Sequence, residues 1–305
     1  MNASTVTTAP VLMIVFRRPS TTQRVFDAVR SARPSQLFIA CNAPRDDHRA
    51  EQEAVAEVRR IVAAVDWPCE VSHLFRERQL PAKVSIATAI DWFFDQVPAG
   101  IILEDDCLPD ASFFPYCSEL LERYRGDRRV GMISGDNFQF GTRRGAGSYY
   151  FSRYAHIWGW ASWADRWREG MDPDLRRWPE LKQRILALFP GGLERMYWRY
   201  IFDAVYRGKI DTWDYQWFLA QLSQHRLCAL PQCNLVSNIG FDAVATNTRS
   251  KTPASAVPSS PLPLPLSHPT ELMPDIAADA YTFARAIRPS IKQMLGRLLR
   301  HRTSG

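Results

Sequence analysis

The strongest constraint on the fold of this chain is a short stretch that runs from Ile101 to Pro109. Three apolar residues that favour β-structure lead straight into three adjacent carboxylates, Glu104, Asp105 and Asp106, and a proline follows shortly after. An apolar run this short, bounded by turn signals, is typical of a strand buried on both faces of a parallel sheet. Ligands of such sheets bind beyond the carboxyl ends of the strands. The pattern therefore indicates a hard divalent cation that itself carries phosphates; the alternative is three solvated acids at an ordinary strand end.

The residues before this stretch alternate between strand and helix patterns. We expect strands over Val11–Phe16, Leu37–Cys41 and Val71–Phe75, and helices after a Ser20 cap, over Asp46–Val65 and after Lys83. This order predicts βαβ units with right-handed crossovers, the first half of a nucleotide-binding sheet. The chain contains neither G-x-G-x-x-G nor G-x-x-x-x-G-K-[ST], which excludes the dinucleotide-binding and P-loop classes.

The acidic triplet is followed by Leu108-Pro109-Asp110-Ala111-Ser112-Phe113-Phe114. Together they resemble the metal-binding motif of GT-A glycosyltransferases, in particular the group around N-acetylglucosaminyltransferase I and its bacterial relatives. The resemblance implies an α/β fold with a Rossmann-like GT-A mixed sheet flanked by helices. It also implies an inverting, metal-dependent hexosyl- or N-acetylhexosaminyltransferase, which uses a nucleotide-sugar donor and a carbohydrate or glycolipid acceptor in bacterial surface polysaccharide or glycoconjugate synthesis. In that family pattern Asp106 holds Mn²⁺ or Mg²⁺, Asp105 binds ribose or sugar, and Glu104 binds the donor sugar.

Two loops resemble the family segments that flank the donor nucleoside. Arg17-Arg18-Pro19 stands where the family has an Asn-Arg-Pro-like loop, and Asn42-Ala43-Pro44-Arg45 stands where it has an Asp-Gly-Pro-Arg-like loop. We therefore predict Arg17, Asn42 and Arg45 as donor-binding residues. An amide both donates and accepts hydrogen bonds, so the usual uracil preference does not carry over to Asn42, which is alternatively an ordinary turn residue.

Lys83 follows a basic loop and opens a helix, a suitable place for a diphosphate. We predict it as a phosphate contact, and a solvated surface lysine is the competing interpretation.

A tryptophan-rich block begins at Tyr149. Aromatic residues at this density are usually core, but Trp158-Gly159-Trp160 resembles the family's Trp-Gly-Trp segment near donor and acceptor. We expect one or two of these rings, Trp158 and Trp160, at the donor site and the others in the core.

A helix start over residues 210–217 carries the candidate catalytic base. Asp211 and Asp214 lie one helical turn apart, with Thr212 as a potential cap. The family match of Trp213-Asp214-Tyr215-Gln216-Trp217 points to Asp214 as the base, with Asp211 the next candidate and Asp136 after it. The alternative is an acid that caps the helix or neutralises its dipole, which suits Asp211 better.

The C-terminal region departs from the family pattern. Where a Thr-His-Thr motif is expected the chain has Thr246-Asn247-Thr248, and asparagine is a weaker metal ligand than histidine. We predict a catalytic domain over residues 1–248, with a nucleotide-sugar half (11–110) and an acceptor half (111–248). A Pro/Ser-rich linker (249–270) and a basic amphipathic tail (271–305) follow.

Charge and composition limit the partners. The net charge is +6, and residues 249–305 hold eight Lys or Arg against three Asp or Glu, so the basicity belongs mainly to the tail and nucleic-acid binding is not indicated. No apolar run could span a bilayer, residues 1–10 lack a secretory signal pattern, and the six cysteines form no CxxC pair. We therefore predict a cytoplasmic enzyme, with peripheral membrane contact through the C-terminal helix; a helix that docks on a partner protein is the alternative.

Two other classes stay open. A sugar-phosphate nucleotidyltransferase shares such a sheet but needs a glycine-rich loop after the first strand, where this chain has Phe16-Arg17-Arg18-Pro19. A non-catalytic nucleotide-sugar-binding module, degenerate at Asn42 and Asn247, would keep donor affinity without turnover.

Overall fold

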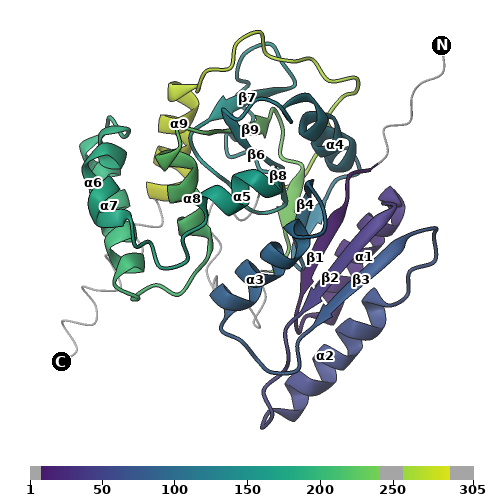
Figure 1. The fold of residues 1–305 in the computed structure, drawn as a ribbon. Helices are drawn as coiled ribbons and strands as arrows, with labels where there is room; N and C mark the ends of the chain where they lie inside the picture. Colours follow the sequence, from purple (N-terminus) through teal and green to yellow (C-terminus); the bar gives the residue numbers. More distant parts are fainter. Residues whose placement is uncertain (1–7, 241–256, 289–305) are drawn as a thin grey trace.

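In a computed structural model, which describes residues 8–240 and 257–288, the chain folds around an eight-stranded mixed β-sheet (Figure 1). Its strands are β1 (Val11–Val15), β2 (Gln36–Cys41), β3 (Glu70–Phe75), β4 (Ala99–Glu104), β6 (Val130–Ser134), β7 (Tyr149–Ser152), β8 (Trp160–Trp163) and β9 (Leu227–Pro231). The order across the sheet is β3-β2-β1-β4-β8-β6-β9-β7. The first four of these are parallel, whereas β8 runs antiparallel to both β4 and β6. A separate small sheet pairs β5 (Cys107–Pro109) with β10 (Val236–Asn238).

Helices cover both faces of the large sheet. They are α1 (Pro19–Ala32), α2 (Arg49–Val62), α3 (Ala82–Phe94), α4 (Phe113–Arg123), α5 (Ala164–Gly170), α6 (Trp178–Ala187), α7 (Gly192–Tyr206), α8 (Asp214–Ser223) and α9 (Ile276–Thr282), which continues into a π-helix (Phe283–Ile287). Successive strand side chains point to opposite faces, so Val11 and Met13 pack with α1, α2 and α4, whereas Leu12 and Ile14 pack with α3, α5 and α8. The expected fold class, an α/β fold with a Rossmann-like mixed sheet flanked by helices, is confirmed.

Two predicted helix caps are wrong. Ser20 does not cap α1, because the helix begins one residue earlier, at Pro19, with Arg18 in the cap position. Proline is favoured there because its missing N–H has no partner in the first turn of a helix in any case. Thr212 does not cap α8, which begins at Asp214, and the Thr212 hydroxyl donates to the Asp214 carboxylate instead.

The region after residue 256 packs on the domain. Leu262 and Leu266 are buried in the core under α4, and the Leu262 amide donates to Ser112 Oγ (2.9 Å). In α9, the buried Asp279 forms an ion pair with Arg153 (2.9 Å). The described part of the segment predicted as a linker therefore packs against the folded domain, because Leu262 and Leu266 bury their apolar side chains in its core.

Several predictions lie outside the described residues. They include the Thr246-Asn247-Thr248 motif and the part of the basic tail beyond residue 288. The domain boundaries therefore stay predictions. No described helix is both long enough and apolar enough to cross a bilayer.

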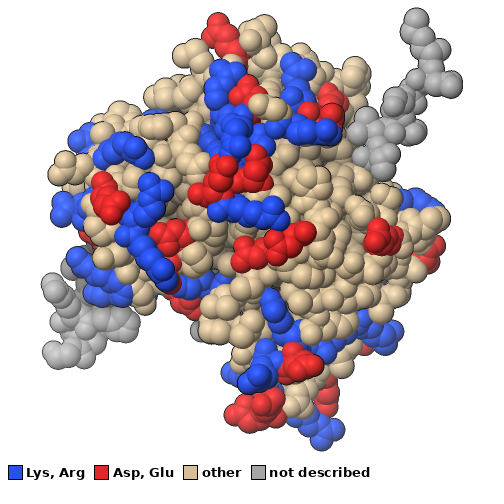
Figure 2. All heavy atoms as spheres, viewed as in Figure 1, with Lys and Arg blue, Asp and Glu red and all other residues tan. Residues whose placement is uncertain are grey.

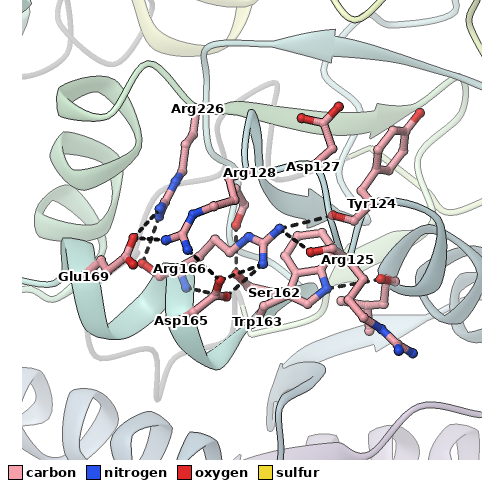
Figure 3. Close-up of polar contacts among 12 residues, drawn as sticks. Tyr124, Arg125, Asp127, Arg128, Ser162, Trp163, Asp165, Arg166, Glu169 and Arg226 are labelled. Carbon is pink, nitrogen blue, oxygen red and sulfur yellow. Dashed lines mark hydrogen bonds and ion pairs between the residues drawn. The ribbon is translucent and has the colours of Figure 1, made fainter.

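Acidic and basic side chains intermingle on the face of the molecule that carries α5 (Figure 2). Beneath them, the buried Arg166 guanidinium lies over the Trp163 ring (4.3 Å) and donates to the Arg125 carbonyl (2.8 Å) (Figure 3). Glu169 of the same helix accepts from Arg226 (2.7 Å), just before β9. These contacts fix α5 against the end of α4, the end of β8 and the start of β9.

Candidate functional site

A cavity of about 950 Å³ opens at the carboxyl ends of β1, β2 and β4. Because these strands are parallel, their carboxyl ends meet at one edge of the sheet, and the segment that leads into α8 also lines the cavity. Ten of the predicted site residues line the cavity, and Trp160 and Asp136 do not; the ten are Arg17, Asn42, Arg45, Lys83, Glu104, Asp105, Asp106, Trp158, Asp211 and Asp214. The structure thus brings together side chains nearly 200 positions apart in the sequence, while their roles stay predictions.

The acidic triplet emerges from β4 beside the end of β1. Ile14 pairs with Glu104 across the two strands, and the Phe16 amide donates to Asp105 Oδ2 (3.0 Å). The Arg18 guanidinium contacts Asp106 and lies 3.6 Å from Asp105. The loop after β1 is therefore tied to the loop after β4 through these carboxylates.

The carboxylates carry more negative charge than Arg18 balances. Burial, with the charges of Asp106 and Asp105 beside it, raises the pKa of Glu104 to about 8. Burial and the charge of Asp106 likewise raise the pKa of Asp105 to about 7. Such raised values indicate a place where additional positive charge is stabilising.

A divalent cation fits the chemistry of this donor set. Among the described residues, no three or more His, Cys, Asp or Glu side chains are grouped so that the protein alone could enclose a metal ion. Mg²⁺ and its relatives are commonly held by only one or two carboxylates, together with substrate phosphates and water. Asp106 and Asp105 face the cavity and provide carboxylates of that kind.

Gly240 lies directly against Asp106, the residue predicted to bind the metal ion. A side chain at Gly240 would place its Cβ 2.2 Å from Asp106 Oδ2, so any larger residue there would force the Asp106 side chain to move. The Ile239 amide also donates to the Asp106 carbonyl (2.8 Å). The end of β10 is thereby fixed over Asp106.

The other end of the cavity is organised around Glu51, which the sequence analysis missed. This acid of α2 is buried and accepts from both Arg17 and Arg45 (2.9 Å to Arg45 Nη2). Burial alone would raise its pKa, but the hydrogen bonds from the two arginines outweigh that effect and lower the pKa of Glu51 to about 2. A signal was present, because Glu51 falls on the same helix face as the buried Val55 and Val58.

Asn42 joins two loops of the cavity. Its Nδ2 donates to the Leu80 carbonyl (2.9 Å), and its Oδ1 accepts from the amides of Leu80 (3.1 Å) and Ala43 (3.0 Å). It therefore shapes the wall as a turn residue would. Any hydrogen bond to a nucleobase depends on the second N–H of its amide.

Lys83, at the start of α3, also lines the cavity. Its ammonium group is 3.5 Å from Asp174 and 3.4 Å from the Pro173 carbonyl, in the loop before α6.

The two tryptophans of Trp158-Gly159-Trp160 separate. Trp158 lines the cavity, and its backbone amide donates to Asp136 Oδ2 (3.0 Å). Trp160 is buried and stacks on Trp213 (5.9 Å between ring centroids). Trp160 is the one predicted donor-binding residue that does not line the cavity. Gly159 makes the separation possible, since its φ of +76° turns the chain between the rings.

Asp214 is the first residue of α8 and faces the acidic triplet. Burial raises its pKa, despite the hydrogen bond from Thr212, and its charge contributes to the raised pKa of Glu104. Asp211 lies before the helix and is exposed at the cavity wall. Asp136, the third candidate base, does not line the cavity; it is buried behind Trp158.

No protein-family model matches the chain, and no curated protein matches its sequence. Similar solved structures include UDP-glucose pyrophosphorylase complexed with UDP-glucose, at 8% identity and a TM-score of 0.38, over 73% of this chain and 90% of that chain. UTP-bound UGPase from Acinetobacter baumannii is 7% identical with a TM-score of 0.35, over 76% and 88%. These neighbours are nucleotide-sugar enzymes, but likenesses this weak say nothing about chemistry, which has to be argued from the site.

Proposed function

We propose that this chain is a metal-dependent, inverting glycosyltransferase of the GT-A type. The observation that carries the proposal is the cavity itself, where the carboxylates at the end of β4 face Asp214 of α8. The proposed donor is a nucleoside diphosphate sugar, and the proposed acceptor is a carbohydrate or glycolipid hydroxyl in surface polysaccharide or glycoconjugate synthesis. A cytoplasmic location stays a prediction.

The donor would lie along the carboxyl ends of the strands. Arg17, Asn42 and Arg45 form the end that suits the nucleoside, where Glu51 holds both arginines in place. Lys83 and Arg18 supply positive charge for the diphosphate, and Glu104, Asp105 and Trp158 surround the sugar. Asp106, with Asp105 beside it, would hold Mn²⁺ or Mg²⁺, and the bound ion would neutralise charge on the leaving diphosphate.

The acceptor side is assigned to Asp214. Its carboxylate accepts the proton of the acceptor hydroxyl while that oxygen bonds to the anomeric carbon of the sugar. The bond from the anomeric carbon to the diphosphate oxygen breaks, and the nucleoside diphosphate leaves with the electron pair. Because burial raises the pKa of Asp214, we expect transfer to decline with falling pH sooner than it would with an ordinary aspartate.

A sugar-phosphate nucleotidyltransferase is the second candidate, since its site would also lie at the carboxyl ends of the parallel strands of such a sheet. Such an enzyme needs a glycine-rich loop after the first strand to surround a triphosphate. Here α1 begins at Pro19, four residues after β1 ends at Val15, and Phe16, Arg17 and Arg18 fill the interval. This short loop without glycine favours the glycosyltransferase over the nucleotidyltransferase.

The proposal is tested by release of nucleoside diphosphate from a panel of nucleotide sugars. Asp214→Asn keeps the size of the side chain but cannot accept the proton. We expect it to reduce turnover by about 10²–10⁴-fold with donor affinity near that of the wild type. Asp211→Asn is the matched control and should stay within a few-fold of the wild type.

Two results would contradict the proposal. One is a fully active Asp214→Asn enzyme, which would move the base elsewhere. The other is release of pyrophosphate from a nucleoside triphosphate and a sugar 1-phosphate, which would establish the nucleotidyltransferase. Donor binding without any turnover would instead favour the non-catalytic module.

A further inference from the structure

The helical hairpin of α6 and α7 exposes an apolar surface that the proposed function does not use. Met196 is 70% exposed, Tyr200 50% and Leu193 45%, and these three residues fall on one face of α7. The opposite face packs through Trp198 and Phe202 into the core below. The apolar residues on the outer face are therefore not required for packing within the domain.

The same surface is basic. Residues 178–209 contain six Lys or Arg and three acids. Of the acids, Glu194 is buried against Tyr154, and Asp203 pairs with Lys182 (2.7 Å), which leaves only Glu180 exposed. Lys and Arg side chains accordingly gather over the hairpin at the left of Figure 2, with uncharged surface between them.

The position of the hairpin connects it with the C-terminus and with the cavity. Phe283 and Ile287 of the π-helix pack in the same apolar cluster as Trp198, so the described chain ends at Arg288 beside α7. The 17 residues that follow contain four Lys or Arg and no acid. At its other end α7 leads directly to residues 210–215, which line the cavity.

We infer that the outer face of α7 docks the protein on an anionic phospholipid surface. Methionine, leucine and tyrosine insert into the boundary between headgroups and acyl chains, while arginines beside them are attracted to anionic headgroups. The face is that of a convex helix rather than a groove, which suits a planar lipid surface better than a single protein segment.

The test is co-sedimentation of the full-length chain with vesicles of phosphatidylcholine mixed with phosphatidylglycerol. We expect Met196→Ser/Tyr200→Ser to reduce the vesicle partition coefficient about tenfold. Arg199→Gln/Arg207→Gln should reduce it about fivefold for each charge removed, with a weaker dependence on salt. Vesicles of phosphatidylcholine alone should bind little.

Matched controls lie elsewhere on the surface. Met273→Ser removes a similarly exposed methionine (65% exposed), and Arg49→Gln removes an exposed arginine (90% of its side chain). Both should bind vesicles like the wild type, and unchanged thermal midpoints establish that all variants are folded. The inference is overturned if both α7 variants bind vesicles like the wild type, if the controls lose as much binding, or if the neutral vesicles bind equally well.

Discussion

The two halves of the molecule bring side chains to the cavity in different ways. In the parallel half, from β1 to β4, each site residue follows the end of a buried strand or opens the next helix, so position in the sequence nearly determines position in the site. In the half that follows, neighbouring residues of one type go to different places, as Trp158 and Trp160 do. In regular βαβ units the strand order thus determines which side chains reach the site. In the aromatic half the outcome depends on single backbone turns, such as the one at Gly159.

The first prediction tests this separation of the two tryptophans. Trp160→Ala removes a ring stacked on Trp213 and packed on Trp167 and Trp217, and should lower the free energy of unfolding by about 4 kcal/mol. Trp158→Ala, on the cavity wall, should cost much less stability and weaken nucleotide-sugar binding instead. Chemical denaturation together with calorimetric titration separates the two effects. Equal stability losses would show that Trp158 is also a core residue.

The second prediction concerns the contact between the aromatic half and α9 in the C-terminal region. The buried Asp279 accepts the Ser152 hydroxyl (2.5 Å) and pairs with the partly buried Arg153, so Asp279→Ala removes the only carboxylate that the structure pairs with this guanidinium among the described residues. We expect a loss of about 3 kcal/mol in the free energy of unfolding. Asp95→Ala, which removes an exposed partner of Arg168, is the control and should change it by less than about 1 kcal/mol. A loss at Asp279 no larger than at Asp95 would mean that α9 is not part of the folding unit.

Much of the fold, but less of the site, follows from the sequence. Apolar runs such as Val130–Ser134 coincide with strands, because a strand buried on both faces must be apolar throughout. The position of the acidic triplet is predictable as well, because charged residues that directly follow such an apolar run mark the point where the buried strand β4 ends. The pairing of Glu51 with two arginines, and the burial of Leu262, depend on contacts between distant segments that no local pattern encodes.

A third prediction concerns the charge held in the parallel half. The pKa of Glu104 is raised to about 8 and that of Asp105 to about 7, so the folded protein binds more protons at neutral pH than the unfolded chain does. The stability of the ligand-free protein should therefore fall as pH rises from about 5 to about 8, by roughly 1 kcal/mol or more. Glu104→Gln should flatten this dependence. A stability that rises over the same range in the wild type, or an unchanged slope in the variant, would contradict the raised values.

The central claim is that the carboxylates at the end of β4 bind a nucleoside diphosphate sugar together with a divalent cation. Its most direct test is calorimetric titration of the wild type, Asp106→Asn and the surface control Asp95→Asn with nucleotide sugars, with and without Mn²⁺. The wild type and the control should bind one class of donor, and bind it more tightly with Mn²⁺, whereas Asp106→Asn should lose that metal-dependent gain while remaining folded. The claim is contradicted if Asp106→Asn keeps the full gain, or if the wild type binds no nucleotide sugar at all.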